Sequence, residues 1–259
     1  MSVDGVKKQV VYIVRYGKTE HNLVESVGPF DSDIDPTEGI EHANSIAKFI
    51  ASNEDVPDLV FSSPFHRCVH TAHVVASSLP SKVLKIEEGL TEWFIPSLLV
   101  DSEGVQTYPK SVSDLSQKYG TIDCNYTSCN AFTKGFGMSE QASAAASTFR
   151  IESEDDLLKR CATTLQRLLK EVIVLNESVV IVSHAPCDQA LAFYLEGSAS
   201  PAESNLGPWP LGGITKFYRY VNNDGTCSEW ALEFYGRTSH MPGEYQPGMK
   251  HWSLPSFEK

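Results

Sequence analysis

VVYIVRYGKTEHN, residues 10–22, begins as a buried strand and ends in polar side chains. Residues 10–14 are all apolar or aromatic and three of the five are valines, which is typical of a strand buried on both faces of a parallel sheet. Arg15, Tyr16 and Gly17 follow immediately. Ligands of open α/β sheets bind beyond the carboxyl ends of the strands, so this stretch predicts a binding site around Arg15 and Tyr16.

Two other short apolar runs, residues 59–61 and 179–182, have the same character. A segment with helical periodicity follows each of the three runs. This alternation predicts a three-layer α/β/α sandwich whose mainly parallel central sheet holds the three runs side by side. Ser63 is expected to cap a helix that begins at Pro64. The other expected elements are helices at 38–51, 155–175 and from 186 onward, a strand at 81–86, and a hairpin of strands 215–221 and 228–234.

The composition of the 259 residues limits the classes of function. The net charge of −12 argues against a general nucleic-acid or membrane-surface binder, because both need a basic face. No window reaches the roughly 20 apolar residues of a membrane span, and residues 1–9 lack the apolar stretch of a signal peptide. Six cysteines spread over this length predict reduced thiols in an intracellular, cytoplasmic protein, with the nucleus left open.

The whole chain, residues 1–259, is expected to form a single domain with an insertion at about 94–150 and a C-terminal arm at about 236–259. Periodicity weakens in the insertion, where helices are expected at 110–119 and 139–149. Loops this long are usually functional or disordered, so the insertion is a candidate surface for a protein partner. The arm suits a docking motif and a tail that wraps its own domain equally well. A homodimer is also compatible with the sequence.

Basic side chains follow all three apolar runs. Arg15 follows the first run, Arg67 lies shortly after the second, and His184 follows the third. Arginine forks match phosphate oxygens and histidine can donate to them, so the three residues predict a site for a phosphate-sized anion. The free N–H groups at the start of the helix after Ser63 would strengthen it. The alternative is that each residue pairs with an acidic neighbour or caps a strand end.

Four segments resemble the motifs of the histidine phosphatase superfamily, which has the phosphoglycerate-mutase-like fold. They are RYGKTEHN (15–22), SSPFHRCVHTA (62–72), GLTEW (89–93) and VIVSHAP (180–186). The matches lie in the family's order and span roughly residues 10–220. The long insertion and the GLTEW context are most similar to one branch. That branch contains ecdysteroid phosphatases, the phosphatase domains of suppressors of T-cell-receptor signalling, and a related subunit of an RNA polymerase III transcription factor.

The resemblance implies a role for each matched position. The residues that would bind phosphate are Arg15, Asn22, Arg67 and His184. Glu92 would be the acid that protonates the leaving oxygen. The nucleophilic histidine of the family corresponds to Tyr16, so this chain departs from the pattern at the residue that attacks phosphorus. No cofactor is implied.

The tyrosine decides which function the resemblance implies. A phenol has a reference pKa of about 10 and is mostly protonated at neutral pH, and a phosphotyrosine ester hydrolyses far more slowly than phosphohistidine. The sequence therefore predicts a pseudophosphatase that keeps a pocket for phosphate or a phosphorylated ligand and acts as a binding or scaffold module. Two alternatives stay open: an active phosphomonoester phosphatase inactivated by an engineered His-to-Tyr change, and weak activity through water attack with Glu92 as acid. Lys18, which replaces the family's Glu or Gln, favours a natural over an engineered origin of Tyr16.

Three histidines raise the question of a metal. His66, His70 and His73 are spaced so that they could share one face of a helix, as in a zinc site. No carboxylate accompanies them at helical spacing, so we expect them to pack or to line the pocket rim, and no metal is expected.

Overall fold

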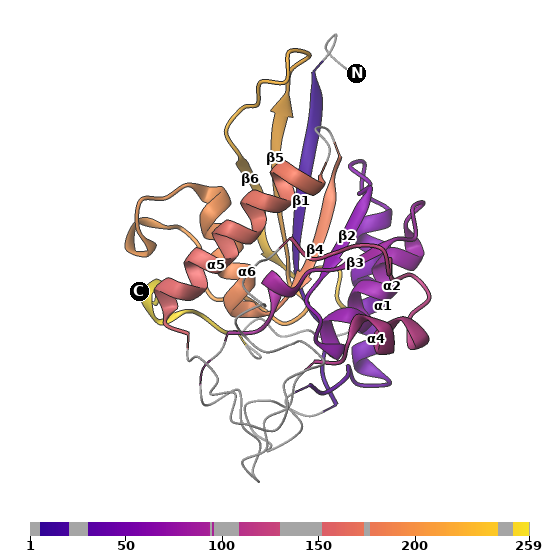
Figure 1. Cartoon of the computed structure of the whole chain (residues 1–259). Coiled ribbons are helices and arrows are strands. Elements are labelled where there is room, and N and C mark those ends of the chain that lie inside the picture. The colour runs from indigo at the N-terminus through magenta and orange to yellow at the C-terminus, as the bar shows by residue number, and fades with distance from the viewer. Residues whose placement is uncertain are drawn as a thin grey trace, which may run out of the picture.

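A six-stranded sheet with the strand order β3-β2-β4-β1-β5-β6 runs through the centre of the molecule (Figure 1). The computed structural model describes residues 6–20, 31–93, 95, 109–129, 152–173, 177–242 and 251–258. The strands are β1 (Lys7–Arg15), β2 (Leu59–Ser62), β3 (Leu84–Ile86), β4 (Val179–Ser183), β5 (Ile214–Val221) and β6 (Ala231–Arg237). The strands β1 to β4 are mutually parallel, whereas β5 runs antiparallel to both of its neighbours.

The three apolar runs are neighbours at the centre of this sheet, as predicted. The strand β4 lies between β2 and β1, with Val11 paired to Val179 on one side and Leu59 paired to Val179 on the other. Arg15 is in register with Ser183 at the carboxyl ends of β1 and β4. The residues that follow these strands therefore meet at one end of the sheet.

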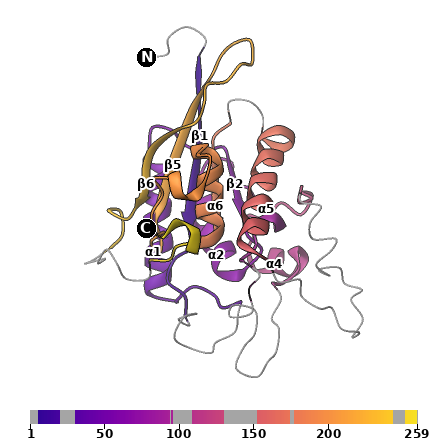
Figure 2. The same ribbon diagram turned by 90° about the vertical axis from the view of Figure 1, so that its left-hand side faces the viewer.

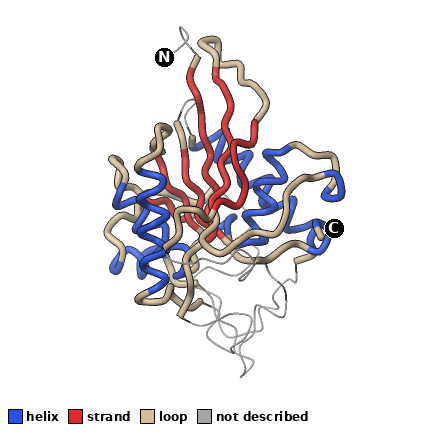
Figure 3. Tube along the Cα trace, turned by 180° about the vertical axis from the view of Figure 1, so that it is seen from behind, coloured by secondary structure: helices blue, strands red, loops and turns tan. Residues whose placement is uncertain are grey.

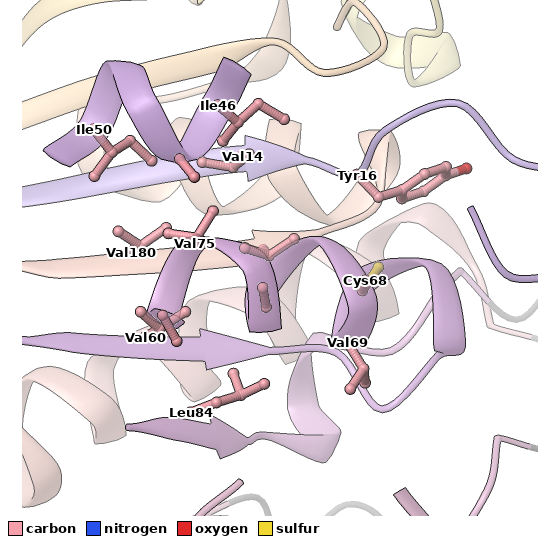
Figure 4. Packing of buried hydrophobic residues seen from close by; sticks show 14 of the residues in the cluster. Val14, Tyr16, Ile46, Ile50, Val60, Cys68, Val69, Val75, Leu84 and Val180 are labelled. Carbon is pink, nitrogen blue, oxygen red and sulfur yellow. The ribbon is translucent and has the colours of Figure 1, made fainter. Parts of the chain in front are cut away.

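Helices cover both faces of the sheet, which confirms the three-layer architecture (Figure 2). The helices α1 (Glu38–Ala51) and α2 (His66–Ser78) lie on one face, and α5 (Glu154–Arg167) and α6 (Ala185–Glu196) lie on the other. Side chains of β1 alternate between the two layers because successive residues of a strand point to opposite faces. Val10, Tyr12 and Val14 join the core under α1 and α2, part of which Figure 4 shows. Val11 and Ile13 join the core under α5 and α6.

The remaining helical elements of the described segments are short. They are α4 (Val112–Lys118), the single turns η1 (Glu88–Leu90), η4 (Pro201–Glu203) and η5 (Pro255–Phe257), and the π-helical turn η3 (Leu168–Val172). The expected helix at 110–119 corresponds to α4, and the one expected at 139–149 lies outside the described residues. Figure 3 shows the predicted hairpin of β5 and β6 extending with β1 past the helices.

Two helix predictions need correction. The helix after β2 begins at His66 and not at Pro64, with Phe65 at the N-cap position, because the Ser63 hydroxyl bonds a histidine elsewhere in the fold. The long helix expected at 155–175 ends at Arg167, where the backbone changes to the wider π turn.

The described part of the C-terminal arm packs on its own domain. Trp252 exchanges backbone hydrogen bonds with Trp209 at 2.7 and 3.2 Å, and Leu254 and Phe257 are buried. These two apolar side chains are therefore used inside the domain. All six cysteines lie in described segments and are free thiols, as predicted. No helix within the described ranges is long and apolar enough to cross a membrane.

Candidate active site

The residues that follow β1, β2 and β4 meet around Tyr16. Arg15 is the last residue of β1, Arg67 is the second residue of α2, and His184 is the N-cap of α6. The guanidinium carbons of Arg15 and Arg67 lie 5.7 and 5.0 Å from the centre of the Tyr16 ring. The His184 ring lies edge-on to the same ring, with centroids 5.6 Å apart. The structure thus brings together the two arginines and the histidine that the strand ends singled out.

Tyr16 follows the end of β1 and lies at the edge of the apolar core under α1 and α2 (Figure 4). Its side chain is enclosed, and the residue is only 5% exposed. The next residue, Gly17, lies against the start of α1, where a Cβ atom would come within 2.8 Å of the Gly39 carbonyl oxygen. The glycine therefore allows α1 to approach the loop after β1, and this approach fixes the direction in which Tyr16 leaves the strand.

Glu92 joins the site from the segment after η1. Its Oε2 atom accepts a hydrogen bond from Arg67 Nη2 at 3.2 Å and lies 3.0 Å from His184 Nδ1. Its Oε1 atom accepts the backbone N–H of Trp93 at 3.0 Å. These donors hold the carboxylate inside the site, and Glu92 is only 4% exposed.

Ser63 completes a buried hydrogen-bonded chain. Its hydroxyl lies 2.8 Å from His184 Nε2 and accepts the Phe65 N–H at 3.4 Å. In the arrangement that gives the Glu92 carboxylate the most donors, the Ser63 hydroxyl donates to Nε2 and His184 Nδ1–H donates to Glu92, while Arg67 Nη2 also lies 3.1 Å from Nδ1. Arg67 then donates to the same carboxylate. Ser63 is therefore a positioning residue that fixes the tautomer of His184.

The protonation states follow from burial and charge. Burial, together with the charge of Arg67, lowers the pKa of His184 to about 4 despite the opposing effect of Glu92. Burial alone would raise the pKa of Glu92, but His184 and Arg67 outweigh it and lower the pKa to about 2. At neutral pH the imidazole is consequently neutral, and Arg67 holds Glu92 as a carboxylate.

The other candidate residues lie outside the hydrogen-bonded group of Ser63, His184, Arg67 and Glu92. Arg15 donates from Nη1 to the Trp209 carbonyl at 2.9 Å. Lys18 forms an ion pair with Glu38 on α1, so its charge is compensated outside the site. Asn22, which the resemblance assigned to phosphate binding, lies outside the described residues.

Two of the three histidines of α2 face the Asp33 carboxylate, and the third contacts a threonine. His70 Nδ1 lies 2.8 Å from an Asp33 carboxylate oxygen, and His73 Nδ1 lies 2.8 Å from the Thr121 hydroxyl. His66 lies near the other Asp33 oxygen, at 3.7 Å. No group of three or more potential metal ligands occurs in the part of the chain that the structure describes.

Comparison with known proteins agrees with this fold. Residues 11–117 match the model of the histidine phosphatase superfamily, branch 1. This match and the six-stranded sheet make the chain similar to proteins of that superfamily in sequence and in fold.

Two curated relatives are similar to the chain over most of its length. The transcription factor tau 55 kDa subunit of Saccharomyces cerevisiae is 28% identical over 204 residues, which are 75% of this chain and 42% of the yeast protein. The chain thus spans less than half of that relative. Phosphoglycerate mutase-like protein 4 of Arabidopsis thaliana is 22% identical over 234 residues, which are 89% of this chain and 86% of the plant protein.

Solved structures share the fold. The ecdysone phosphate phosphatase of Bombix mori, crystallised with tungstate, has a TM-score of 0.61 and 14% identity, covering 95% of this chain and 98% of that chain. The phosphoserine phosphatase of Entamoeba histolytica, crystallised with 3-phosphoglyceric acid, has a TM-score of 0.52 and 24% identity, covering 90% of this chain and 100% of that chain.

Proposed function

We propose that this chain is a pseudophosphatase: it keeps an anion pocket built from Arg15, Arg67 and His184 and binds phosphate or a phosphorylated ligand without turning it over. The observation that carries the proposal is the place of Tyr16. Its ring lies against all three of these residues, where a superfamily enzyme would present its nucleophile.

The chemistry of the site supports loss of turnover. A phenol near neutral pH is a protonated, weak nucleophile, and the aryl phosphate it would form is too stable for a second step. The acid is also poorly prepared, because the pKa of Glu92 is lowered to about 2 and its carboxylate has no proton to give near pH 7. The two arginines can act without the nucleophile, since charge-assisted hydrogen bonds to an oxyanion need only their guanidinium groups.

A reversion tests the proposal. We expect the unmodified chain to show no turnover of a chromogenic phosphate ester and Tyr16→His to gain it, with Arg67→Met added to Tyr16→His removing the gain. Turnover by the unmodified chain that survives Arg67→Met would contradict the assignment of the site. If both the unmodified chain and Tyr16→His are inactive, the ionised Glu92 is a second block, and the binding role gains weight.

The runner-up is an active phosphomonoester phosphatase, either weakly active with water as the nucleophile or silenced by an engineered change at Tyr16 alone. The hydrogen bonds that link Ser63, His184 and Glu92 favour an active enzyme, because they hold the imidazole in one tautomer with Nδ1 directed at the carboxylate. The same assay separates the proposal from weak activity, since only a weakly active phosphatase predicts turnover by the unmodified chain.

A scaffold role in an assembly is the form of binding that the yeast relative suggests, because that relative is a named subunit of a transcription factor. Leu254 and Phe257 of the arm are buried in the fold, and so are Leu115 and Ile122 of the insertion at about 94–150, so contact with a partner protein would use the exposed side chains of either segment. Sedimentation velocity of the purified chain would reveal a homodimer. Affinity purification from the native host, with the exposed Ser113 and Gln117 of α4 changed to arginine as control, would test for a partner bound at the insertion.

A further inference from the structure

The carboxylate of Glu92 already occupies donors that an anion in this pocket would need. Arg67 Nη2 and His184 Nδ1 both face its Oε2 atom, at 3.2 and 3.0 Å. The Trp93 N–H holds Oε1 at 3.0 Å. A carboxylate with three donors and almost no exposure is fixed in position. Any oxyanion that enters between the arginines and His184 therefore lies against a stationary negative charge.

The charge on this carboxylate persists at physiological pH. Burial opposes ionisation, but His184 and Arg67 outweigh it, so the pKa of Glu92 is about 2. His184 does not supply a proton to Glu92 at pH 7, because the pKa of His184 is about 4 and its imidazole is neutral. Glu92 therefore acts toward a ligand as a hydrogen-bond acceptor only.

An acceptor of this kind separates two classes of tetrahedral anion. A phosphate monoester loses its second proton near pH 6, so close to that pH much of it still carries a P–O–H group that can donate a hydrogen bond. Sulfate has the same shape but carries no proton there. Its oxygens would place lone pairs against the Glu92 carboxylate. This repulsion costs free energy in a buried site, because neither the sulfate nor the carboxylate carries a hydrogen that could bridge the two groups.

We propose that Glu92 is a specificity-determining residue, which makes the pocket select a protonated oxyanion, a phosphate or phosphomonoester with a P–O–H group, over an anion without a proton such as sulfate. This inference rests on the proposed function, because it takes the anion pocket of Arg15, Arg67 and His184 as given. The inference adds which protonation state of the ligand is bound and which residue selects it.

Isothermal titration calorimetry of the full chain with inorganic phosphate and with inorganic sulfate, at about pH 6, tests the proposal. A hydrogen bond to a charged group distinguishes the two anions, so we expect phosphate to bind about tenfold to a hundredfold more tightly than sulfate. In Glu92→Gln the amide presents a donor as well as an acceptor. Sulfate should then bind with an affinity within about threefold of that for phosphate.

Glu87→Gln is the matched control. Glu87 is a fully buried glutamate close to the same segment, and its carboxylate accepts from Tyr126, Ser128 and the Gly89 N–H. These donors lie outside the pocket, so the change removes a buried negative charge and leaves the donors of Arg67 and His184 as they are. We expect this variant to keep the preference for phosphate, and circular dichroism would establish that each variant is folded.

The outcomes separate the inference from the proposed function. Equal affinity for the two anions in the unmodified chain, or a preference that persists in Glu92→Gln, overturns the role of Glu92. If the unmodified chain binds the anions in either of these ways and Arg67→Met does not bind them, the anion pocket itself stands. Binding that survives Arg67→Met lies elsewhere, and binding of neither anion by any variant removes the pocket; both results overturn the proposed function together with the inference.

Discussion

Replacing Arg67 by methionine should destabilise the fold severely, because it leaves the Glu92 carboxylate buried without its guanidinium. Arg67 has no exposed surface, and its Nη2 atom donates to Glu92 at 3.2 Å. The pKa of Glu92 falls from an ordinary 4.5 to about 2, which corresponds to about 3 kcal/mol in favour of the ionised form. Arg67 and His184 share this effect. Breaking a buried pair typically costs about 3–5 kcal/mol, and we expect a loss in that range at pH 7.

Urea unfolding at pH 7 measures this loss, and a second variant shows its origin. In Arg67→Met with Glu92→Gln neither partner carries a charge, so the double variant should recover at least about half of the lost stability. Arg237→Ala, which removes an arginine that lies over the Phe49 and Phe234 rings at the surface of β6, serves as the control and should cost less than about 1 kcal/mol. A loss below about 1 kcal/mol in Arg67→Met, or a double variant as unstable as the single one, would refute the pairing of Arg67 with Glu92.

Three further predictions concern the same site. Because the folded-state pKa of Glu92 lies below its unfolded value, the stability that it contributes is present above about pH 4.5 and is lost as pH falls toward 2; thermal unfolding between these pH values should show this loss, and Glu92→Gln should reduce it. Ser63→Ala should cost about 1–3 kcal/mol and shift the ¹⁵N signals of His184 toward a mixture of tautomers, whereas unchanged signals would show that Ser63 does not set the tautomer. Gly17→Ala should destabilise the protein by about 1–3 kcal/mol in denaturant titrations, because its Cβ would meet the Gly39 carbonyl oxygen at 2.8 Å; a neutral result would contradict the close approach of α1.

The sequence predicted the centre of the fold well because the signal there is local. Short apolar runs are typical of strands that are buried on both faces of a parallel sheet, so residues 10–14, 59–61 and 179–182 were placed correctly. Parallel strands end at one edge, and this alone brought Arg15, Arg67 and His184 to one place.

The sequence missed features that depend on packing between distant segments. Ser63 has the local pattern of a helix cap, and only the approach of His184, 121 residues away, draws its hydroxyl into the site. Its position directly after β2, like that of Arg15 at the end of β1, was the available signal. The burial of Glu92 was equally hidden, because the Arg67 and Trp93 donors that hold it come together only in the folded chain.

The central claim is that Tyr16 occupies the position of the nucleophile that would accept a phosphoryl group. A tyrosine at this position cannot both accept the group and release it. Intact-mass spectrometry of the unmodified chain and of Tyr16→His, each mixed with a reactive phosphate ester and quenched within seconds, tests this claim most directly. We predict that the unmodified chain keeps its mass and that Tyr16→His gains one phosphoryl group on residue 16. A phosphoryl group on the unmodified chain at Tyr16, released again on further incubation, would contradict the account.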